Sequence, residues 1–326
     1  MESELPTRVR PIATPEGWSA HAGTLADTVC LTGRGLHTGR KVTVRVLPAA
    51  PEDARRGIVF RRVTRNPTKR RVLAEFPVTP DLWRHEPLCS TLKPEKSVGV
   101  RTVEHLLAAL LMCEIDSATV ELDAEEVPIL DGGAKTWVKA FTAAGRVALP
   151  APKRFIRVLK KLTFEYPEDD CRYVIAPARG YRIKCRTKVR HFPRMVWGGV
   201  LTPASFAAEV APARTYGPAW WAAPAIMFGV LSGKPIMRGI RLSSVAATFH
   251  GKVIGGMILP DELVRHRALD LIGDFAMAGF PLLGNVSAVR PAHARNHKVI
   301  SALLATPDAW EWAECRKTPA PKKDTA

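Results

Sequence analysis

Several features that would classify a protein at once are missing from this 326-residue sequence. No apolar run approaches the roughly 20 residues that a membrane-spanning helix needs. The N-terminus, Met-Glu-Ser-Glu-Leu-Pro-Thr-Arg, lacks the apolar core of a secretory signal. The six cysteines form no Cys-x-x-Cys pair, so reduced thiols are a better interpretation than disulfides. These absences favour a globular protein of the cytoplasm.

Acidic residues are scarce, and most of all in one stretch. The formal net charge is +17, and residues 181–260 contain eleven Lys or Arg but a single acid, Glu209. Such a charge attracts nucleic acid, an anionic lipid or a diphosphate substrate, although a basic surface also serves solubility alone. No helix-turn-helix, RNA-recognition or zinc-finger pattern accompanies it, so no nucleic-acid partner is expected. A nucleic-acid-binding protein is an alternative that rests on charge alone.

The patterns along the chain predict an α+β fold of two domains with a similar layout. A chain of this length exceeds what one small core usually supports. Leu149-Pro-Ala-Pro-Lys interrupts the periodicity and is interpreted as a linker. The predicted division is a flexible N-terminus (1–22), domain I (23–149), domain II (150–315) and a flexible tail (316–326).

Individual elements follow from periodicity and capping. Thr102 is predicted to be the N-cap of a helix that runs through Leu111. The two prolines of 218–227 disfavour a helix there. Strands are expected at 41–47, 119–123, 154–158, 173–176 and 282–288, and further helices at 134–144, around His266 and at 297–304.

His266, Asp270 and Asp274 recur every four residues, which places them on one stripe of a helix. An isolated His/Asp pair at this spacing is usually only a surface pair. The apolar neighbours of these residues indicate a buried helix, however, where an unpartnered Asp is costly. His266 and Asp270 are therefore candidate metal ligands.

A second dyad, Glu104-His105, precedes an apolar run. His105 can supply a third ligand, and three ligands with one open position are typical of catalytic zinc. Glu104 can then act as the general base that takes a proton from an attacking water. On the sequence alone, stabilisation of the helix N-terminus is the better interpretation of Glu104.

His293 is the candidate general acid for a leaving amine. Asp274 is the natural carboxylate to orient and charge it. His297, four residues later, competes for the same role, and a single loop histidine is usually just exposed to solvent.

Five motifs occur in a fixed order, and together they are far more specific than any one of them. In order along the chain they are Gly33-Arg-Gly-Leu-His-Thr-Gly, Thr-Val-Glu-His-Leu-Leu-Ala-Ala-Leu, Glu-Val-Pro-Ile-Leu-Asp-Gly, Ala-Arg-Thr-Tyr-Gly and Val-Arg-His-Arg-Ala-Leu-Asp-Leu-Ile-Gly-Asp. From about Val29 to Ala313 the chain closely resembles the UDP-3-O-acyl-N-acetylglucosamine deacetylases of lipid A biosynthesis in Gram-negative bacteria.

The resemblance implies two domains, each a β-α-α-β sandwich, that meet at a zinc site. It implies hydrolysis of the substrate acetamide to a free amine and acetate by a zinc-dependent amidohydrolase, the committed step of lipid A and lipopolysaccharide synthesis. It assigns the metal to His105, His266 and Asp270, the base to Glu104, the acid to His293, its partner to Asp274 and oxyanion stabilisation to Thr215. It places the substrate, with its acyl chain in a narrow apolar passage, near Leu36, His37, Leu88, Cys89, Tyr216 and Arg267.

The resemblance also sets expectations about partners. One Zn2+ per chain is expected, with Fe2+ as the alternative, in a monomer that makes transient contact with the inner membrane surface. Arg267 stands where the family usually has Lys. The positive charge is kept, but a planar guanidinium replaces a compact ammonium group. The segment 218–243 is atypical, so a catalytically weakened relative that still binds a nucleotide sugar or lipid anion is a second alternative.

Overall fold

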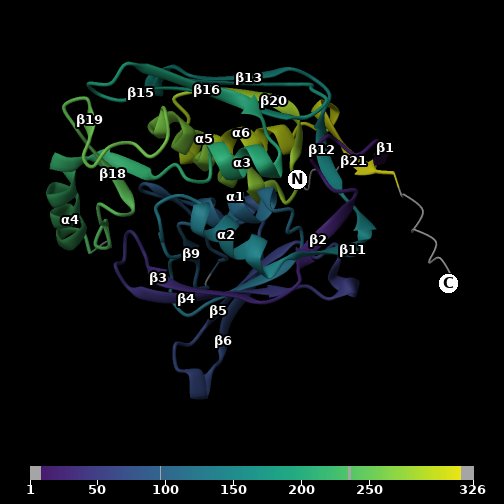
Figure 1. Ribbon diagram of the computed structural model, residues 1–326, viewed down its shortest axis with the longest axis horizontal. Helices are drawn as coiled ribbons and strands as arrows, with labels where there is room; N and C mark the ends of the chain where they lie inside the picture. The colour runs from purple at the N-terminus through teal and green to yellow at the C-terminus, as the bar shows by residue number, and fades with distance from the viewer. Residues whose placement is uncertain (1–8, 96, 234–235, 317–326) are drawn as a thin grey trace.

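Helices lie between two β-sheets in the computed structural model, which describes residues 9–95, 97–233 and 236–316 (Figure 1). One sheet comes from the first half of the chain and the other mainly from the second half. Buried apolar side chains from both sheets and from the helices between them form one continuous core. The predicted α+β fold, with helices packed against sheets in both halves, is confirmed.

The first sheet has five strands in the order β3-β4-β10-β5-β6. Val42, Val44 and Val46 of β4 are buried and alternate with more exposed residues, as the sequence pattern predicted. The strands are β3 (Val29–Arg34), β4 (Lys41–Pro48), β5 (Ile58–Val63), β6 (Val72–Pro77) and β10 (Ala118–Leu122), and the helices of this half are α1 (Glu104–Met112) and α2 (Lys135–Ala144).

The second sheet has eight strands, and its central strand β20 pairs with β12, β14 and β15. It consists of β1 (Val9–Ile12), β12 (Arg154–Val158), β13 (Leu162–Tyr166), β14 (Cys171–Ala176), β15 (Tyr181–Lys188), β16 (Arg194–Val200), β20 (Leu282–Val289) and β21 (Trp310–Cys315). The helices of this half are α3 (Pro203–Glu209), α4 (Ala222–Leu231), α5 (Glu262–Phe275) and α6 (His293–Leu304).

Three small sheets complete the fold. The first pairs β2 (His21–Leu25) with β11 (Arg146–Pro152), the second contains β7 (Trp83–Glu86), β8 (Cys89–Leu92) and β9 (Val100–Arg101), and the third contains β17 (Thr215–Pro218), β18 (Val245–Phe249) and β19 (Lys252–Val253).

Helices α1 and α5 cross in direct contact, and a glycine makes this possible. A Cβ atom added to Gly273 of α5 would lie 2.0 Å from the backbone carbonyl oxygen of Glu104 in α1. Only glycine therefore lets the first turn of α1 approach α5 this closely. This crossing brings Glu104 and His105 to the polar stripe of α5.

The predicted flexible N-terminus is wrong for residues 9–22. Strand β1 pairs in parallel with β21, so that Val9 lies opposite Trp312, and β2 begins at His21. Two exposed strand edges gain hydrogen bonds by this pairing. Residues 1–8, and all of the predicted tail except Arg316, lie outside the described residues.

The predicted linker is also wrong, because Leu149-Pro-Ala-Pro lies in β11 and Lys153 follows directly. Leu149 and Ala151 are buried, and the Nζ atom of the fully buried Lys153 lies 2.6 Å from Asp116 Oδ1. Among the described strands β11 pairs only with β2, so prolines that lack an N–H are tolerated there. The boundary between domains I and II at residue 150 stays a prediction.

Two helix starts differ from prediction, and one helix forms in a segment where the prolines disfavoured it. Val103, not Thr102, is the N-cap of α1; Thr102 adopts φ 57°, and its hydroxyl donates to Glu126 Oε1 at 3.0 Å. Helix α4 forms because Pro224 is its third residue, where an N–H would have no intrahelical partner. Helix α6 begins at His293, four residues earlier than predicted.

The remaining helices and strands agree with the expected ranges to within a few residues. All six cysteines are free thiols, as predicted. Within the described residues, no helix combines the length and the apolar content that crossing a membrane requires.

Candidate metal and acid–base site

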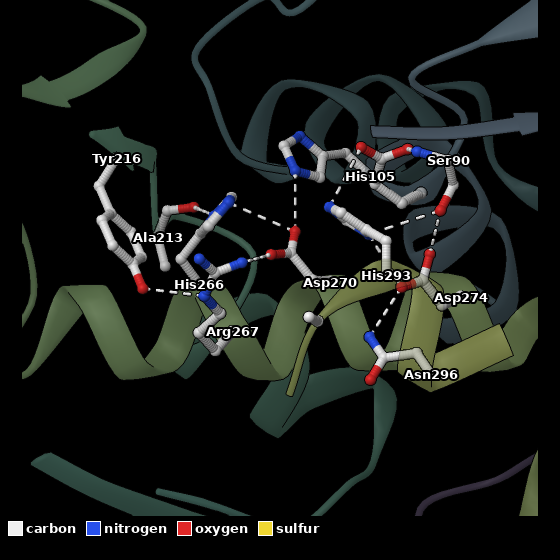
Figure 2. Close-up of polar contacts among 12 residues, drawn as sticks. Ser90, His105, Ala213, Tyr216, His266, Arg267, Asp270, Asp274, His293 and Asn296 are labelled. Atoms are coloured by element: carbon white, nitrogen blue, oxygen red, sulfur yellow. Dashed lines mark hydrogen bonds and ion pairs between the residues drawn. The ribbon is translucent and has the colours of Figure 1, made fainter. Parts of the chain in front are cut away.

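Three buried side chains from two helices converge at one point. Asp270 Oδ1 lies 3.3 Å from His266 Nε2 and 3.5 Å from His105 Nε2 (Figure 2). One nitrogen or oxygen atom from each of the three lies within 4.8 Å of those of the other two. The i,i+4 spacing on α5 supplies two of them, and the crossing with α1 supplies the third. The structure thus brings together the predicted trio, and none of the three residues is more than 5% exposed.

The protonation of His266 makes this cluster a suitable site for a cation. His266 Nδ1 lies 3.1 Å from the backbone carbonyl oxygen of Ala213, an acceptor, so Nδ1 carries the proton. Burial lowers the pKa of His266 to about 4, so the imidazole is neutral at pH 7 and Nε2 presents a lone pair. This lone pair faces the carboxylate oxygen Asp270 Oδ1. Two lone-pair atoms 3.3 Å apart attract a shared cation. A set of two imidazole nitrogens and a carboxylate oxygen fits a divalent metal ion.

Asp270 is held in its ionised form. Burial opposes its charge, but the cationic His293, a hydrogen bond from His105 and the charge of Arg267 keep its pKa well below the usual range. For His105 burial opposes protonation, yet the hydrogen bond to Asp270 and the charge of Glu104 raise its pKa overall. The carboxylate is therefore available as a ligand at neutral pH.

Glu104 lies beside this trio, in the first turn of α1. Its side chain is 3% exposed, and burial raises its pKa to about 7. Oε2 accepts a hydrogen bond of 3.1 Å from the backbone N–H of Ser90, and Oε1 lies 4.0 Å from His293 Nε2. A carboxyl with a pKa near neutrality is suited to exchange a proton with a reactant.

His293 and Asp274 form the predicted pair. His293 Nδ1 donates to Asp274 Oδ2 at 2.9 Å, and Asn296 Nδ2 donates to the same oxygen at 2.7 Å (Figure 2). Burial disfavours the charged imidazole, but Asp274 and Asp270 raise the pKa of His293 to about 10. His293 is consequently a cation at pH 7, and its Nε2 points toward Glu104.

His297 does not share this position. It is 2% exposed, stacks on Trp83 with ring centroids 4.4 Å apart, and is absent from the lining of the cavity that His293 faces. Its Nε2 lies 2.8 Å from Ser90 Oγ. Of the two competing histidines, only His293 lines the described cavity.

Ser90 contacts both Glu104 and Asp274, the partner of His293. The sequence analysis did not identify this residue. Its hydroxyl donates to Asp274 Oδ1 at 2.5 Å, while its N–H contacts Glu104. Its partners lie 14 to 207 positions away, and a single serine in a strand carries no signal of such contacts.

The ligand trio, Glu104 and His293 open into a cavity of about 420 Å³ between the two halves of the chain. Cys89 is 1% exposed and does not line this cavity, so the structure does not place it with the other predicted substrate contacts. The predicted residues that do line it are Leu36, His37, Leu88, Thr215, Tyr216 and Arg267.

His37 and Thr215 both line this cavity. Neither ring nitrogen of the buried His37 has a hydrogen-bond partner among the described residues, and burial lowers its pKa to about 4. His37 therefore presents a neutral imidazole to the cavity. The N–H of Thr215 donates to the carbonyl oxygen of Gly132 at 2.7 Å, which fixes the start of β17.

Arg267 is engaged within the protein. Its Nε donates to Tyr216 Oη at 2.8 Å, and its Nη1 donates to Asp270 Oδ2 at 3.2 Å (Figure 2). The guanidinium also lies 5.0 Å from the centroid of the Tyr216 ring. Arg267 therefore orients Asp270, and only its remaining donors are free for a ligand.

Glu126 ties three of the sequence motifs together and was likewise missed. Its buried carboxylate accepts from the N–H groups of His37 and Thr38 at 2.8 and 2.7 Å, and from the hydroxyls of Thr38 and Thr102 at 2.6 and 3.0 Å. A Cβ atom at Gly35 would lie 2.1 Å from Glu126 Oε2, so this position requires glycine. Glu126 thereby fixes the loop that carries His37 and the strained residue Thr102, two positions before Glu104.

Comparison with known proteins identifies the family. The family described as UDP-3-O-acyl N-acetylglycosamine deacetylase matches residues 22–305. A UDP-3-O-acyl-N-acetylglucosamine deacetylase of Vibrio cholerae serotype O1 is 35% identical over 300 residues, which cover 89% of this chain and 92% of the relative. Proteins of the same name from Pseudoalteromonas translucida and Vibrio atlanticus are 35% and 34% identical, with the same coverage. This chain therefore belongs to the UDP-3-O-acyl-N-acetylglucosamine deacetylase family.

Proposed function

We propose that this protein is a zinc-dependent deacetylase that hydrolyses the acetamide of UDP-3-O-acyl-N-acetylglucosamine to a free amine and acetate, in lipid A biosynthesis. One observation carries this proposal. A metal-ligand trio, a carboxyl whose pKa is near 7 and a cationic histidine face one cavity in a member of this family. Metal-assisted hydrolysis of an amide uses these three components: a Lewis acid, a base for the attacking water and an acid for the leaving amine.

His105, His266 and Asp270 would hold the metal, because their ligand atoms already converge and the lone pair of His266 faces Asp270. A bound zinc ion would polarise the acetamide carbonyl and lower the pKa of a coordinated water. Nitrogen and oxygen ligands suit zinc and also suit ferrous iron, and we propose one zinc ion per chain with iron as the alternative.

The proton transfers follow from the two flanking residues. Glu104, as a carboxylate, takes a proton from the attacking water while the new C–O bond forms at the carbonyl carbon. Thr215 lines the cavity at the start of β17 and would stabilise the developing oxyanion. His293, protonated and oriented by Asp274, donates a proton to the nitrogen as the C–N bond breaks, which releases acetate and the amine.

The remaining contacts would bind the substrate. Leu36 and Leu88 offer apolar surface, His37 offers a neutral imidazole, and Tyr216 offers an aromatic ring in the cavity. Arg267 would attract the diphosphate with its free donors while it holds Asp270. We further propose a cytoplasmic monomer, consistent with six free thiols, that makes transient contact with the inner membrane surface.

The test is acetate release from UDP-3-O-acyl-N-acetylglucosamine by protein of known zinc content, with a chelated sample as the control. Turnover that stops on chelation and returns with zinc is expected. Turnover that resists chelation would remove the metal from the mechanism. One bound zinc without turnover would instead favour a weakened relative.

A further inference from the structure

Helix α4 presents its large apolar side chains to solvent and its small ones to the protein. Ala225 and Gly229 are buried, whereas Met227, Phe228 and Val230 are 60 to 61% exposed and Leu231 is 80% exposed. The helix contains no charged residue. A surface helix normally buries its large apolar face, so this arrangement indicates a face that meets something apolar.

Further exposed apolar side chains lie on β18 and in the loop after β19. Phe249 at the end of β18 is 52% exposed, and in the loop after β19 Met257 and Ile258 are 45 and 54% exposed. Helix α4, β18 and β19 lie together at one end of the molecule, left in Figure 1. We define the apolar face as Met227, Phe228, Val230, Leu231, Phe249, Met257 and Ile258.

Exposed cations lie in the same segment as the apolar face. Arg238, Arg241 and Lys252 are exposed, and within the part of the chain that the structure describes none has a carboxylate within 4.0 Å. The only acid between residues 181 and 260, Glu209, lies on α3 and pairs with Arg265 at 3.2 Å. Uncompensated cations around an apolar helix are typical of proteins that lie on an anionic lipid surface.

The cavity of the site extends toward this end of the molecule. Pro218, Trp221 and Met237 line it, and Trp221 and Met237 pack with Ala225 of α4. An acylated substrate that leaves a bilayer beneath the apolar face would therefore enter the cavity from the same end of the molecule.

We propose that the apolar face, with Arg238, Arg241 and Lys252 around it, docks on a bilayer of anionic phospholipid. This proposal deepens the proposed function, on which it rests for the acylated substrate. A second copy of the chain is a poorer occupant, because a contact of the face with itself would bring like charges together.

The first experiment measures co-sedimentation of the full-length protein with vesicles of phosphatidylglycerol and phosphatidylethanolamine. The double variant Phe228→Ser/Leu231→Ser should bind at least about tenfold more weakly, because its exposed apolar side chains no longer enter the interface. The matched control is Val72→Ser/Leu73→Ser on β6, which removes two side chains that are 57 and 49% exposed outside the apolar face and should bind like wild type. Equal binding by wild type and Phe228→Ser/Leu231→Ser would overturn the proposal.

Two further measurements separate the sources of binding. Arg241→Gln/Lys252→Gln should bind the anionic vesicles more weakly, and all proteins should bind pure phosphatidylcholine vesicles weakly. A dimer in solution that Phe228→Ser/Leu231→Ser dissociates, without vesicle binding by wild type, would assign the face to a second copy and contradict the proposal. Acetate release from detergent-dispersed substrate tests the proposed function separately, and Phe228→Ser/Leu231→Ser should retain it.

Discussion

The first turn of α5 and the turns that follow both bury charged side chains, but these side chains differ in how fully they are paired. Glu262, fully buried, accepts hydrogen bonds from the N–H, Nε and Nη2 of Arg214 and from the N–H of Ile258, at 2.8 to 3.1 Å. One turn later, His266 presents a lone pair to the carboxylate of Asp270. The charges of the first pair are fully compensated within the protein, whereas the second pair leaves two acceptors that suit a cation.

We propose that this difference separates charges that stabilise the fold from charges that serve chemistry. Glu262 has its pKa lowered despite burial, because Arg214 and two N–H groups compensate its charge. Glu104 is compensated less fully: Oε2 accepts one N–H and His293 lies 4.0 Å from Oε1, and burial still raises its pKa to about 7. Complete pairing is expected where a buried charge has only a structural role, and incomplete pairing where it must react.

The largest expected effect is a loss of turnover on substitution of Glu104, the buried glutamate that is not paired with an arginine as Glu262 is. Glu104→Gln should lower turnover by about 10² to 10⁴-fold because an amide cannot accept the proton of the attacking water. The variant should keep its zinc, since the ligands are untouched. Steady-state acetate release and metal analysis on the same sample test this, and an unimpaired rate would remove Glu104 from the role of base.

Substitution of the partner of Glu262, Arg214→Met, should lower the free energy of unfolding. It leaves Glu262 buried without its partner, which costs about 3 to 5 kcal/mol in the free energy of unfolding. Urea denaturation measures the loss. The double variant Arg214→Met/Glu262→Met is the control and should recover much of it, since no uncompensated charge remains. A single variant as stable as wild type would contradict the structural role of this pair.

A third change tests how His293 is charged. Asp274 raises the pKa of His293, so Asp274→Asn should lower that pKa and reduce turnover by about 10 to 100-fold. The acid must be protonated, so activity falls as pH rises through its pKa, and this alkaline limb should move to lower pH in the variant. The pH profile of kcat separates this from a structural defect, which would lower activity without moving the limb.

The smallest expected effect concerns Ser90. Ser90→Ala removes a hydrogen bond to Asp274, worth about 1 kcal/mol, and should lower turnover about fivefold. Ser90→Thr retains the hydroxyl and should restore most of the rate. If the alanine and threonine variants lost activity equally, the hydroxyl would not be the cause.

Local patterns predicted local features well. The four-residue spacing of His266, Asp270 and Asp274 predicted one buried helix stripe, and the alternation of residues 41–47 predicted a strand with one buried face. Both signals depend only on the geometry of a single element. The choice of His105 as the third ligand depended on chemistry and on the resemblance, because no local pattern indicates that α1 crosses α5.

The errors arose where distant contacts override local preference. Lys153 and the prolines before it suggested a linker, yet Asp116 pairs with Lys153 in the core. Thr102 has the chemistry of an N-cap, but Glu126, 24 residues later, takes its hydroxyl. Ser90 gave no signal at all, since its contacts exist only after α1, α5 and α6 have assembled.

The most direct test of the central claim is the zinc content of three proteins, measured after chelation and titration with zinc. Wild type should bind one zinc ion per chain and His266→Ala none, because the lone pair that faces Asp270 is gone. Glu262→Gln on the same helix should bind one, since its position lies outside the ligand trio. Full occupancy in His266→Ala, or none in wild type, would contradict the claim that unpaired acceptors on α5 mark a metal site.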